Sequence, residues 1–216
     1  MQIHIVAGGP LAMIPNLPEY DNENVSWIGV DRGLLYLLNQ GIIPIKGIGD
    51  FDSVSKVEME WLNTTYKEFM LSPAEKDETD LELALNWAIE QKPSKIIVFG
   101  ATGGRLDHGL SNIQLLLKGF KYKLDIEIID VQNSVKLVEP GTHLLTKEHR
   151  YKYVSFLPFS HEVIGITITG VKYPLTNVDI NWGTTLCVSN EIIEESGTFS
   201  FKQGIVIMVK SKDFME

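Results

Sequence analysis

Two aspartates stand two residues apart in the stretch GIGDFDS, directly after a short hydrophobic segment. In an extended segment, residues i and i+2 point to the same side, so Asp50 and Asp52 would lie side by side while Phe51 would point into the core. Hard divalent cations prefer oxygen ligands, and Mg²⁺ commonly takes one or two carboxylates together with substrate phosphates. The alternative is a solvent-exposed turn in which Ser53 caps the next helix. This stretch alone leaves the metal site and the turn equally open.

A second acidic stretch, EKDETD at residues 75–80, leads into the clearest helical pattern of the chain. Asp77 and Asp80 are three residues apart and can share a face at the start of that helix. Lys76 supplies a cation beside them, which either contacts a phosphate or balances charge. The structural alternative is strong, because acidic residues at a helix N-terminus complement the macrodipole. Thr79 with Glu82 also fits a capping box at this point.

The third candidate is the stretch GATGGRLDHGLSN at residues 100–112, in which a strand enters a glycine-rich loop and a helix leaves it. Glycines allow the backbone to approach an anion closely, and the N–H groups that start a helix favour phosphate. Arg105 adds a planar guanidinium suited to phosphate oxygens. Asp107 and His108 cap the helix, contact a ligand, or do both. The stretch is neither a Walker A loop nor a complete G-x-G-x-x-G fingerprint.

These stretches belong to a part of the chain that alternates strand and helix patterns. Strands are expected at residues 3–9, 25–31, 45–50, 95–104 and 126–130, and helices at residues 32–41, 54–62, 80–92 and 108–119. This alternation predicts a mostly parallel sheet covered by helices on both faces. In such sheets, ligands bind beyond the carboxyl ends of the strands. Asp31 also falls at a predicted strand end, so the acidic and glycine-rich stretches are expected at one edge of one sheet.

The pattern changes after about residue 133, where short strand-like runs with turn signals follow one another and no convincing helix pattern remains. We expect an all-β domain over residues 134–216, after an α/β domain over residues 1–133. The expected fold class is therefore α/β, with an N-terminal mostly parallel sheet covered by helices, plus a C-terminal all-β sandwich-like domain.

The composition excludes several classes of partner. The 216 residues carry a formal net charge of −9 and contain no Lys/Arg-rich run, which argues against binding to nucleic acid or to an anionic membrane. The N-terminal stretch lacks a signal-peptide pattern, and no apolar run approaches the roughly 20 residues that span a bilayer. The single cysteine, Cys187, suits a reducing cytosol and is expected in a buried strand. We therefore expect a cytoplasmic protein.

Carboxylates, a basic pair and glycine loops at one sheet edge together indicate Mg²⁺–nucleotide chemistry. In their order and spacing, GDFDS, KDETDLELAL and GATGGRLDHGLSNIQLL resemble the thiamine pyrophosphokinase family. GVKYPLTN at residues 170–177 and WGTTLCVSNE at residues 182–191 resemble that family's thiamine-side motifs. The resemblance implies an enzyme that transfers diphosphate from ATP to thiamine, giving thiamine diphosphate and AMP. It also implies a homodimer whose active site lies at the subunit interface.

The resemblance further implies roles for individual residues, each carried over by motif. Asp50, Asp52 and Asp80 would bind Mg²⁺ on the ATP phosphates, and the catalytic set would be Asp31, Asp50, Asp52, Asp77 and Asp80. The nucleotide-binding set would be Lys76, Thr79, Thr102, Gly103, Arg105, Asp107, His108 and Asn112. The thiamine-binding set would be Tyr173, Ser189 and Asn190, with the tyrosine ring stacked on the cationic ligand. Either Asp31 or Asp80 would accept a hydrogen bond from the attacking hydroxyl, and the motifs do not distinguish between them.

Two alternatives come from other functional classes. A Mg²⁺-dependent nucleotide hydrolase would use the acidic stretches but would need no aromatic site in the β domain. A non-catalytic sensor of nucleotide or thiamine would bind its ligands without turnover, although binding alone rarely needs so many carboxylates. Thiamine-independent phosphate release would favour the hydrolase, and binding without turnover would favour the sensor.

Overall fold

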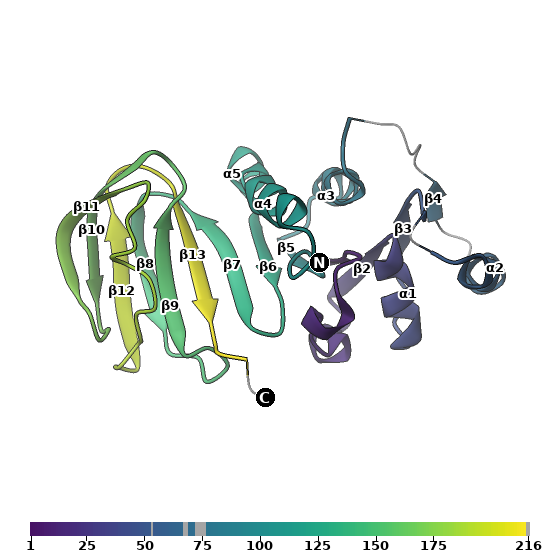
Figure 1. Cartoon of the computed structure of the whole chain (residues 1–216), viewed down its shortest axis with the longest axis horizontal. Coiled ribbons are helices and arrows are strands. Elements are labelled where there is room, and N and C mark those ends of the chain that lie inside the picture. The colour runs from purple at the N-terminus through teal and green to yellow at the C-terminus, as the bar shows by residue number, and fades with distance from the viewer. Residues whose placement is uncertain (53, 67–68, 72–76, 215–216) are drawn as a thin grey trace. The chain divides into compact units, whose positions relative to one another are not determined.

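The computed structural model describes residues 1–52, 54–66, 69–71 and 77–214 of the chain. The chain forms two compact units, Met1–Val131 and Gln132–Glu216, which we describe separately (Figure 1). The first has a parallel sheet with helices and the second is antiparallel all-β, so the predicted fold class is confirmed. Among the described helices, none is long and apolar enough to cross a membrane.

The first unit is built on parallel strands in the order β4-β3-β2-β1-β5-β6. The strands are β1 (Gln2–Val6), β2 (Val25–Val30), β3 (Lys46–Gly49), β4 (Phe69–Leu71), β5 (Lys95–Phe99) and β6 (Asp125–Ile129). The run QIHIV of β1 and the run KIIVF of β5 are buried along almost their whole length, as expected for central strands covered on both faces. The chain moves from β1 to β4 on one side and returns to β5 and β6 on the other. The topological switch point, where such sheets bind ligands, therefore lies between β1 and β5.

Helices lie on both faces of this sheet, with α1 on one face and α3, α4 and α5 on the other (Figure 1). The α-helices are α1 (Arg32–Asn39), α2 (Lys56–Thr65), α3 (Asp80–Glu90), α4 (Leu106–Leu115) and α5 (Lys118–Tyr122), and the short 3₁₀ helices are η1 (Leu11–Met13) and η2 (Leu17–Tyr20). The helix predicted at residues 108–119 is thus two helices, α4 and the start of α5.

The starts of α2 and α3 differ in detail from their sequence-based descriptions. Ser55 caps α2 in a complete capping box with Glu58, while Ser53 lies outside the described residues. Thr79 caps α3 as predicted, because its side chain accepts a hydrogen bond of 3.2 Å from the Glu82 N–H. Among the described contacts, the Glu82 carboxylate does not accept the hydrogen bond from the Thr79 N–H that would complete a capping box. It lies instead 3.0 Å from Lys118 Nζ.

The second unit is a sandwich in which the antiparallel strands β7-β13-β9 pack against the antiparallel sheet β11-β10-β12-β8. Its strands are β7 (Asn133–Val138), β8 (Gly141–Thr146), β9 (Tyr153–Pro158), β10 (Glu162–Thr169), β11 (Leu175–Asn181), β12 (Ser196–Phe201) and β13 (Val206–Ser211). One buried apolar cluster takes residues from both sheets. Within it, the rings of Phe156 in β9 and Phe199 in β12 stack at 3.9 Å between centroids. Cys187 is buried in the same cluster, but it lies in a turn and not in the predicted strand.

Candidate active site

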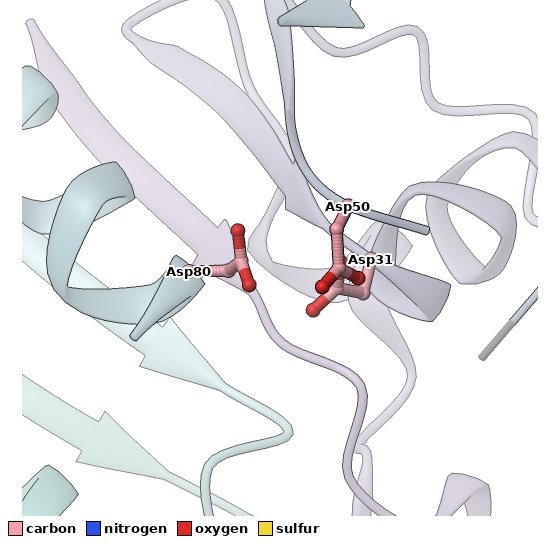
Figure 2. Close-up of side chains that lie close together, drawn as sticks. All are labelled: Asp31, Asp50 and Asp80. Atoms are coloured by element: carbon pink, nitrogen blue, oxygen red, sulfur yellow. The ribbon is translucent and has the colours of Figure 1, made fainter. Parts of the chain in front are cut away.

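Three carboxylates meet at the carboxyl-end edge of the parallel sheet. Asp31 follows β2, Asp50 follows β3, and Asp80 is the first residue of α3. Each offers an oxygen that lies within 4.8 Å of the oxygens of the other two, and all three residues are half-buried (Figure 2). Because β2 and β3 pair in parallel, their carboxyl ends necessarily adjoin, which brings Asp31 beside Asp50. Three oxygen ligands at this spacing fit a hard divalent cation.

The position of Asp31 depends on the absence of a side chain at Gly49. A Cβ built on Gly49 would lie 2.0 Å from Asp31 Oδ1, and the Gly49 φ of 156° is rare for other residues. The Phe51 N–H donates a hydrogen bond of 3.3 Å to the same Oδ1. Asp31 itself has a φ of 47°, a conformation that costs a non-glycine residue free energy and persists only where the surroundings hold it. Gly49 therefore belongs to the site, although the sequence patterns gave it no role.

The electrostatics of Asp31 also fit a cation site. Burial raises the pKa of its carboxyl from 3.8 to about 6, and the negative charge of Asp80 adds to this effect. Asp50 and Asp52 raise the pKa further, while the Phe51 N–H opposes the change. Carboxylates packed this closely repel one another, and a bound divalent cation would remove the repulsion.

The segment around Phe51 is a tight turn, so the predicted extended conformation is wrong. Phe51 has a φ of 57°, and the Asp52 N–H donates a hydrogen bond of 3.0 Å to Asp50 Oδ1. Phe51 is 3% exposed and packs with Leu34 and Leu62, which confirms the prediction that it points into the core. Because the chain turns at Phe51, Asp52 is exposed and stands outside the group formed by Asp31, Asp50 and Asp80. The carboxylate that joins Asp50 is Asp31.

The loops that follow β1 and β5 lie against each other at the switch point. The Gly9 N–H donates a hydrogen bond of 2.9 Å to the Gly100 carbonyl, and a Cβ on Gly9 would lie 2.4 Å from that carbonyl oxygen. Gly103 has a φ of 76°, which favours glycine. Buried Asn112 in α4 donates a hydrogen bond of 2.9 Å from Nδ2 to the Ala101 carbonyl. Asn112 therefore fixes the loop after β5 through a buried hydrogen bond to its backbone.

Asp130 is a buried carboxylate at this edge that the sequence analysis did not select. It directly follows β6, is 0% exposed, and accepts a hydrogen bond of 2.6 Å from Thr102 Oγ1. The available signal was its place at a predicted strand end, the same signal that singled out Asp31. The contact ties the β5 loop to the neighbouring strand end.

The other predicted nucleotide residues are exposed or lie outside the described residues. Arg105 and Asp107 form an exposed ion pair of 2.6 Å, which raises the pKa of the guanidinium and lowers that of the carboxyl. Asp107 also accepts a hydrogen bond of 2.9 Å from the His108 N–H. Exposed pairs of this kind contribute little stability, so Arg105 can exchange its partner for an anion at small cost. Asp77 and Thr79 are exposed before α3, and Lys76 lies outside the described residues.

The three predicted thiamine residues belong to the second unit, and two of them are directly joined. Asn190 is buried, accepts a hydrogen bond of 3.0 Å from the Tyr173 N–H and donates one of 2.8 Å to the Tyr173 carbonyl. The Tyr173 side chain is 59% exposed, so its ring is available to a ligand. Ser189 has a φ of 59°, and its N–H donates to Ser155 Oγ at 2.9 Å. The buried amide of Asn190 thus fixes the segment that presents the ring.

Comparisons with known proteins identify the family of the chain. The family model "Thiamin pyrophosphokinase, catalytic domain" matches residues 17–129, and "Thiamin pyrophosphokinase, vitamin B1 binding domain" matches residues 142–206. A curated thiamine pyrophosphokinase from Bacillus subtilis is 49% identical over 211 residues, which cover 98% of this chain and 99% of that protein.

Solved structures give the same result. The crystal structure of the Bacillus subtilis thiamine pyrophosphokinase matches with a TM-score of 0.95 at 48% identity, over 99% of this chain and 100% of that chain. That of the Geobacillus thermodenitrificans thiamin pyrophosphokinase matches with a TM-score of 0.92 at 50% identity, over 99% of this chain and 98% of that chain. These matches confirm the resemblance seen in the motifs, and the chain belongs to the thiamine pyrophosphokinase family.

Proposed function

We propose that this chain is an ATP:thiamine diphosphotransferase, which transfers the diphosphate of ATP to the hydroxyl of thiamine and releases AMP. The observation that carries the proposal is the group of Asp31, Asp50 and Asp80 at the carboxyl-end edge of the sheet. Diphosphate transfer needs neutralisation of phosphate charge and positioning of the reacting groups more than covalent chemistry. Membership of the family supports the choice of ATP and thiamine as substrates.

Mg²⁺ is the proposed cofactor. Asp50 and Asp80 would hold it, with Asp31 as the third oxygen ligand, and Asp52 would act from the exposed side of the same turn. When bound, the cation neutralises the phosphate oxygens and so lets a polyanion enter an acidic site. Oxygen ligands and the mutual repulsion of the three carboxylates both suit this hard cation.

The nucleotide is proposed to bind at the switch point of the first unit, so that residues 1–133 form the nucleotide- and metal-binding domain. Its contacts would come from the β5 loop, from the start of α4 and from the residues before α3. The proposed residues are Lys76, Asp77, Thr79, Thr102, Gly103, Arg105, Asp107, His108 and Asn112. The close packing of Gly9 on Gly100 supports this assignment, since it holds the loops after β1 and β5 together at the switch point, where such sheets bind ligands.

Residues 134–216 are proposed to form the thiamine-binding domain. The exposed ring of Tyr173 would stack on the cationic ligand, while Ser189 and Asn190 would complete the site. An active site shared between subunits of a homodimer is part of the proposal, as is a cytoplasmic location, where ATP is available.

A carboxylate of this chain would accept a hydrogen bond from the attacking hydroxyl of thiamine. Asp31 is the preferred acceptor of its hydrogen bond, because Gly49 and the Phe51 N–H fix its carboxylate in one position. Asp80 is the alternative. Replacing each by Asn should lower kcat sharply for the true acceptor, and unchanged kcat for both variants would exclude the assignment.

The deciding experiment is an assay with ATP, Mg²⁺ and thiamine that measures AMP, ADP and thiamine diphosphate. Formation of AMP and thiamine diphosphate in equal amounts supports the proposal. Thiamine-independent release of phosphate would identify a hydrolase, and binding of both substrates without turnover would identify a sensor.

A matched pair of variants makes the assay specific for the carboxylate group. Asp50→Asn removes one charge at the carboxyl-end edge of the sheet, and Asp125→Asn removes one at the amino end of β6. Asp50→Asn should reduce kcat by at least about a hundredfold, while Asp125→Asn should leave it unchanged.

A further inference from the structure

The second unit contains a cavity of about 600 Å³ that the proposed chemistry does not use. It lies between the ends of β8 and β13, the start of β9 and residues 191–193. Its volume falls within the roughly 300–1,000 Å³ that is typical of small-molecule sites. Tyr173, Ser189 and Asn190 do not line it, and neither does any described residue of the first unit.

The lining of this cavity is basic, although the chain as a whole carries a formal charge of −9. The lining contains five lysine or arginine residues and three acidic residues. The basic residues are Lys147, Arg150, Lys152, Lys210 and Lys212, and the acidic residues are Glu148, Glu191 and Asp213. A concave surface with this local excess attracts anions that the rest of the protein repels.

Each of the three acidic residues already has a partner. Glu148 pairs with Lys210, and Asp213 accepts a hydrogen bond of 3.1 Å from the Tyr153 hydroxyl. Glu191 lies 2.8 Å from Lys172, a residue outside the cavity lining, and this contact lowers the pKa of its carboxyl. Two of the three negative charges of the lining are therefore paired with a lysine, and the charge of Asp213 is hydrogen-bonded but not neutralised.

Three of the lysines are left for a ligand. In the described part of the chain, no carboxylate forms an ion pair with Lys147, Lys152 or Lys212, whereas Lys210 is paired. Lys152 Nζ lies 4.7 Å from the centroid of the Tyr153 ring, which orients its ammonium group without neutralising it. Three ammonium groups around one cavity suit an anion of more than one charge.

The remaining walls are aromatic and apolar. Tyr151 and Tyr153 contribute rings, and buried Val154 and half-buried Ile192 contribute apolar surface. The cavity thus combines cations with surfaces on which a ring can pack, as sites for charged organic ligands do.

We propose that this cavity binds the diphosphate group of a small molecule. Inorganic diphosphate, a nucleoside diphosphate and thiamine diphosphate share that group, and the test below distinguishes these sources. The site would bind diphosphate through ammonium groups alone. It therefore needs no divalent cation, unlike the site formed by Asp31, Asp50 and Asp80, and it does not rest on the proposed catalytic activity.

The test measures binding by isothermal titration calorimetry with the full chain in EDTA. Without a divalent cation, the carboxylate group repels diphosphate, so the measured binding reports the basic cavity. Inorganic diphosphate, ADP and thiamine diphosphate are titrated separately. We expect binding that weakens as the salt concentration rises.

Charge reversal locates the site. Lys152→Glu/Lys212→Glu should weaken metal-free diphosphate binding at least about tenfold. The control is Lys92→Glu/Lys121→Glu, which makes the same charge change on exposed lysines of the first unit. Lys121 is well matched to Lys152, because its Nζ lies 5.2 Å over the neighbouring Tyr122 ring. Thermal denaturation verifies that both double variants fold.

The outcomes are distinct. Equal affinity for the three ligands assigns recognition to the diphosphate group alone, and tighter binding of ADP or thiamine diphosphate adds the tyrosine rings to the site. The proposal is overturned if none of the three ligands binds without metal at millimolar concentration. It is also overturned if the cavity variant and the control variant bind equally well.

Discussion

Thr102 Oγ1 donates a hydrogen bond of 2.6 Å to Oδ2 of Asp130, a carboxylate that is completely buried. The contact joins the loop after β5 to the residue after β6, at the edge where the glycine loops lie. A buried carboxylate loses stabilisation when one of its donors is removed, so this bond helps to fix the loop.

Thr102→Val is therefore expected to weaken both stability and nucleotide binding. Valine keeps the shape of threonine but removes the donor, which should lower the free energy of unfolding by about 1–3 kcal/mol and raise the KM for ATP. Urea denaturation and steady-state kinetics measure the two effects. Thr169→Val is the control, because it removes an exposed hydroxyl contact of the second unit and should leave the KM for ATP unchanged. An unaltered KM in Thr102→Val would show that the loop is held by other contacts.

Gly49→Ala should damage the carboxylate group. Its Cβ would lie 2.0 Å from Asp31 Oδ1, so the Asp31 side chain must move away from Asp50. We expect kcat to fall at least about tenfold, because misplacement of about 1 Å at a catalytic group has effects of this order.

Gly41→Ala is the matched control for the backbone effect at Gly49. Gly41 also has a positive φ, of 75°, but a Cβ there would meet no atom within 4 Å. This variant should lose about 1 kcal/mol of stability and keep its kcat. Equal kcat in both glycine variants would contradict the proposed dependence of Asp31 on Gly49.

Asp31→Asn should stabilise the metal-free protein while it lowers activity. Because burial and Asp80 raise the pKa of Asp31 from 3.8 to about 6, the charged carboxylate destabilises the fold above pH 6. Removing the charge should raise the free energy of unfolding at pH 7 in EDTA by about 1–3 kcal/mol. The gain should vanish near pH 4, where Asp31 is largely protonated in the folded state, and should shrink when Mg²⁺ is added. Urea denaturation at both pH values, with and without Mg²⁺, measures this, and a destabilised variant in EDTA would refute it.

His4 should make the protein sensitive to acid. Its ring is 2% exposed between Trp27 and Phe99, and within the described residues neither ring nitrogen has a hydrogen-bond partner. Burial first, and then the charge of Lys95, lower its pKa from 6.5 to about 4, while Asp21 opposes this effect. The unfolded chain therefore binds a proton first as the pH falls through 6.5, and stability decreases down to about pH 4.

His4→Phe tests this origin of acid sensitivity. Between pH 7 and pH 4.5 the wild-type chain should lose about 2–3 kcal/mol more stability than the variant, as measured by urea denaturation. An identical pH dependence in the two proteins would assign the acid sensitivity to other groups.

Much of this protein was predictable from local patterns. The buried strands, the helix at α3 with its Thr79 cap, the glycine loop and the burial of Phe51 all depend on residues close together in the sequence. The change to an all-β unit after about residue 133 was equally visible, because strand and helix periodicities are local properties. The motifs also specify the family without reference to the fold.

Other features depend on long-range packing. Asp31 and Asp50 meet because β2 and β3 pair in parallel, and Asp80 joins them because α3 begins at the same edge. Asp52 lies outside this group because the chain turns at Phe51. Phe51 adopts a left-handed conformation, which is uncommon for an aromatic residue and is therefore not predicted from its type.

The hydrogen bond between Thr102 and Asp130 could not be predicted from local sequence patterns either, because the two residues are 28 positions apart. Likewise, the basic cavity collects its lysines from two segments far apart in the sequence, residues 146–154 and 210–213. The sequence by itself determined which elements form and which family they belong to, since both reside in neighbouring residues. Only the tertiary structure decided which charges come together, because strand order and turn geometry bring distant residues into contact.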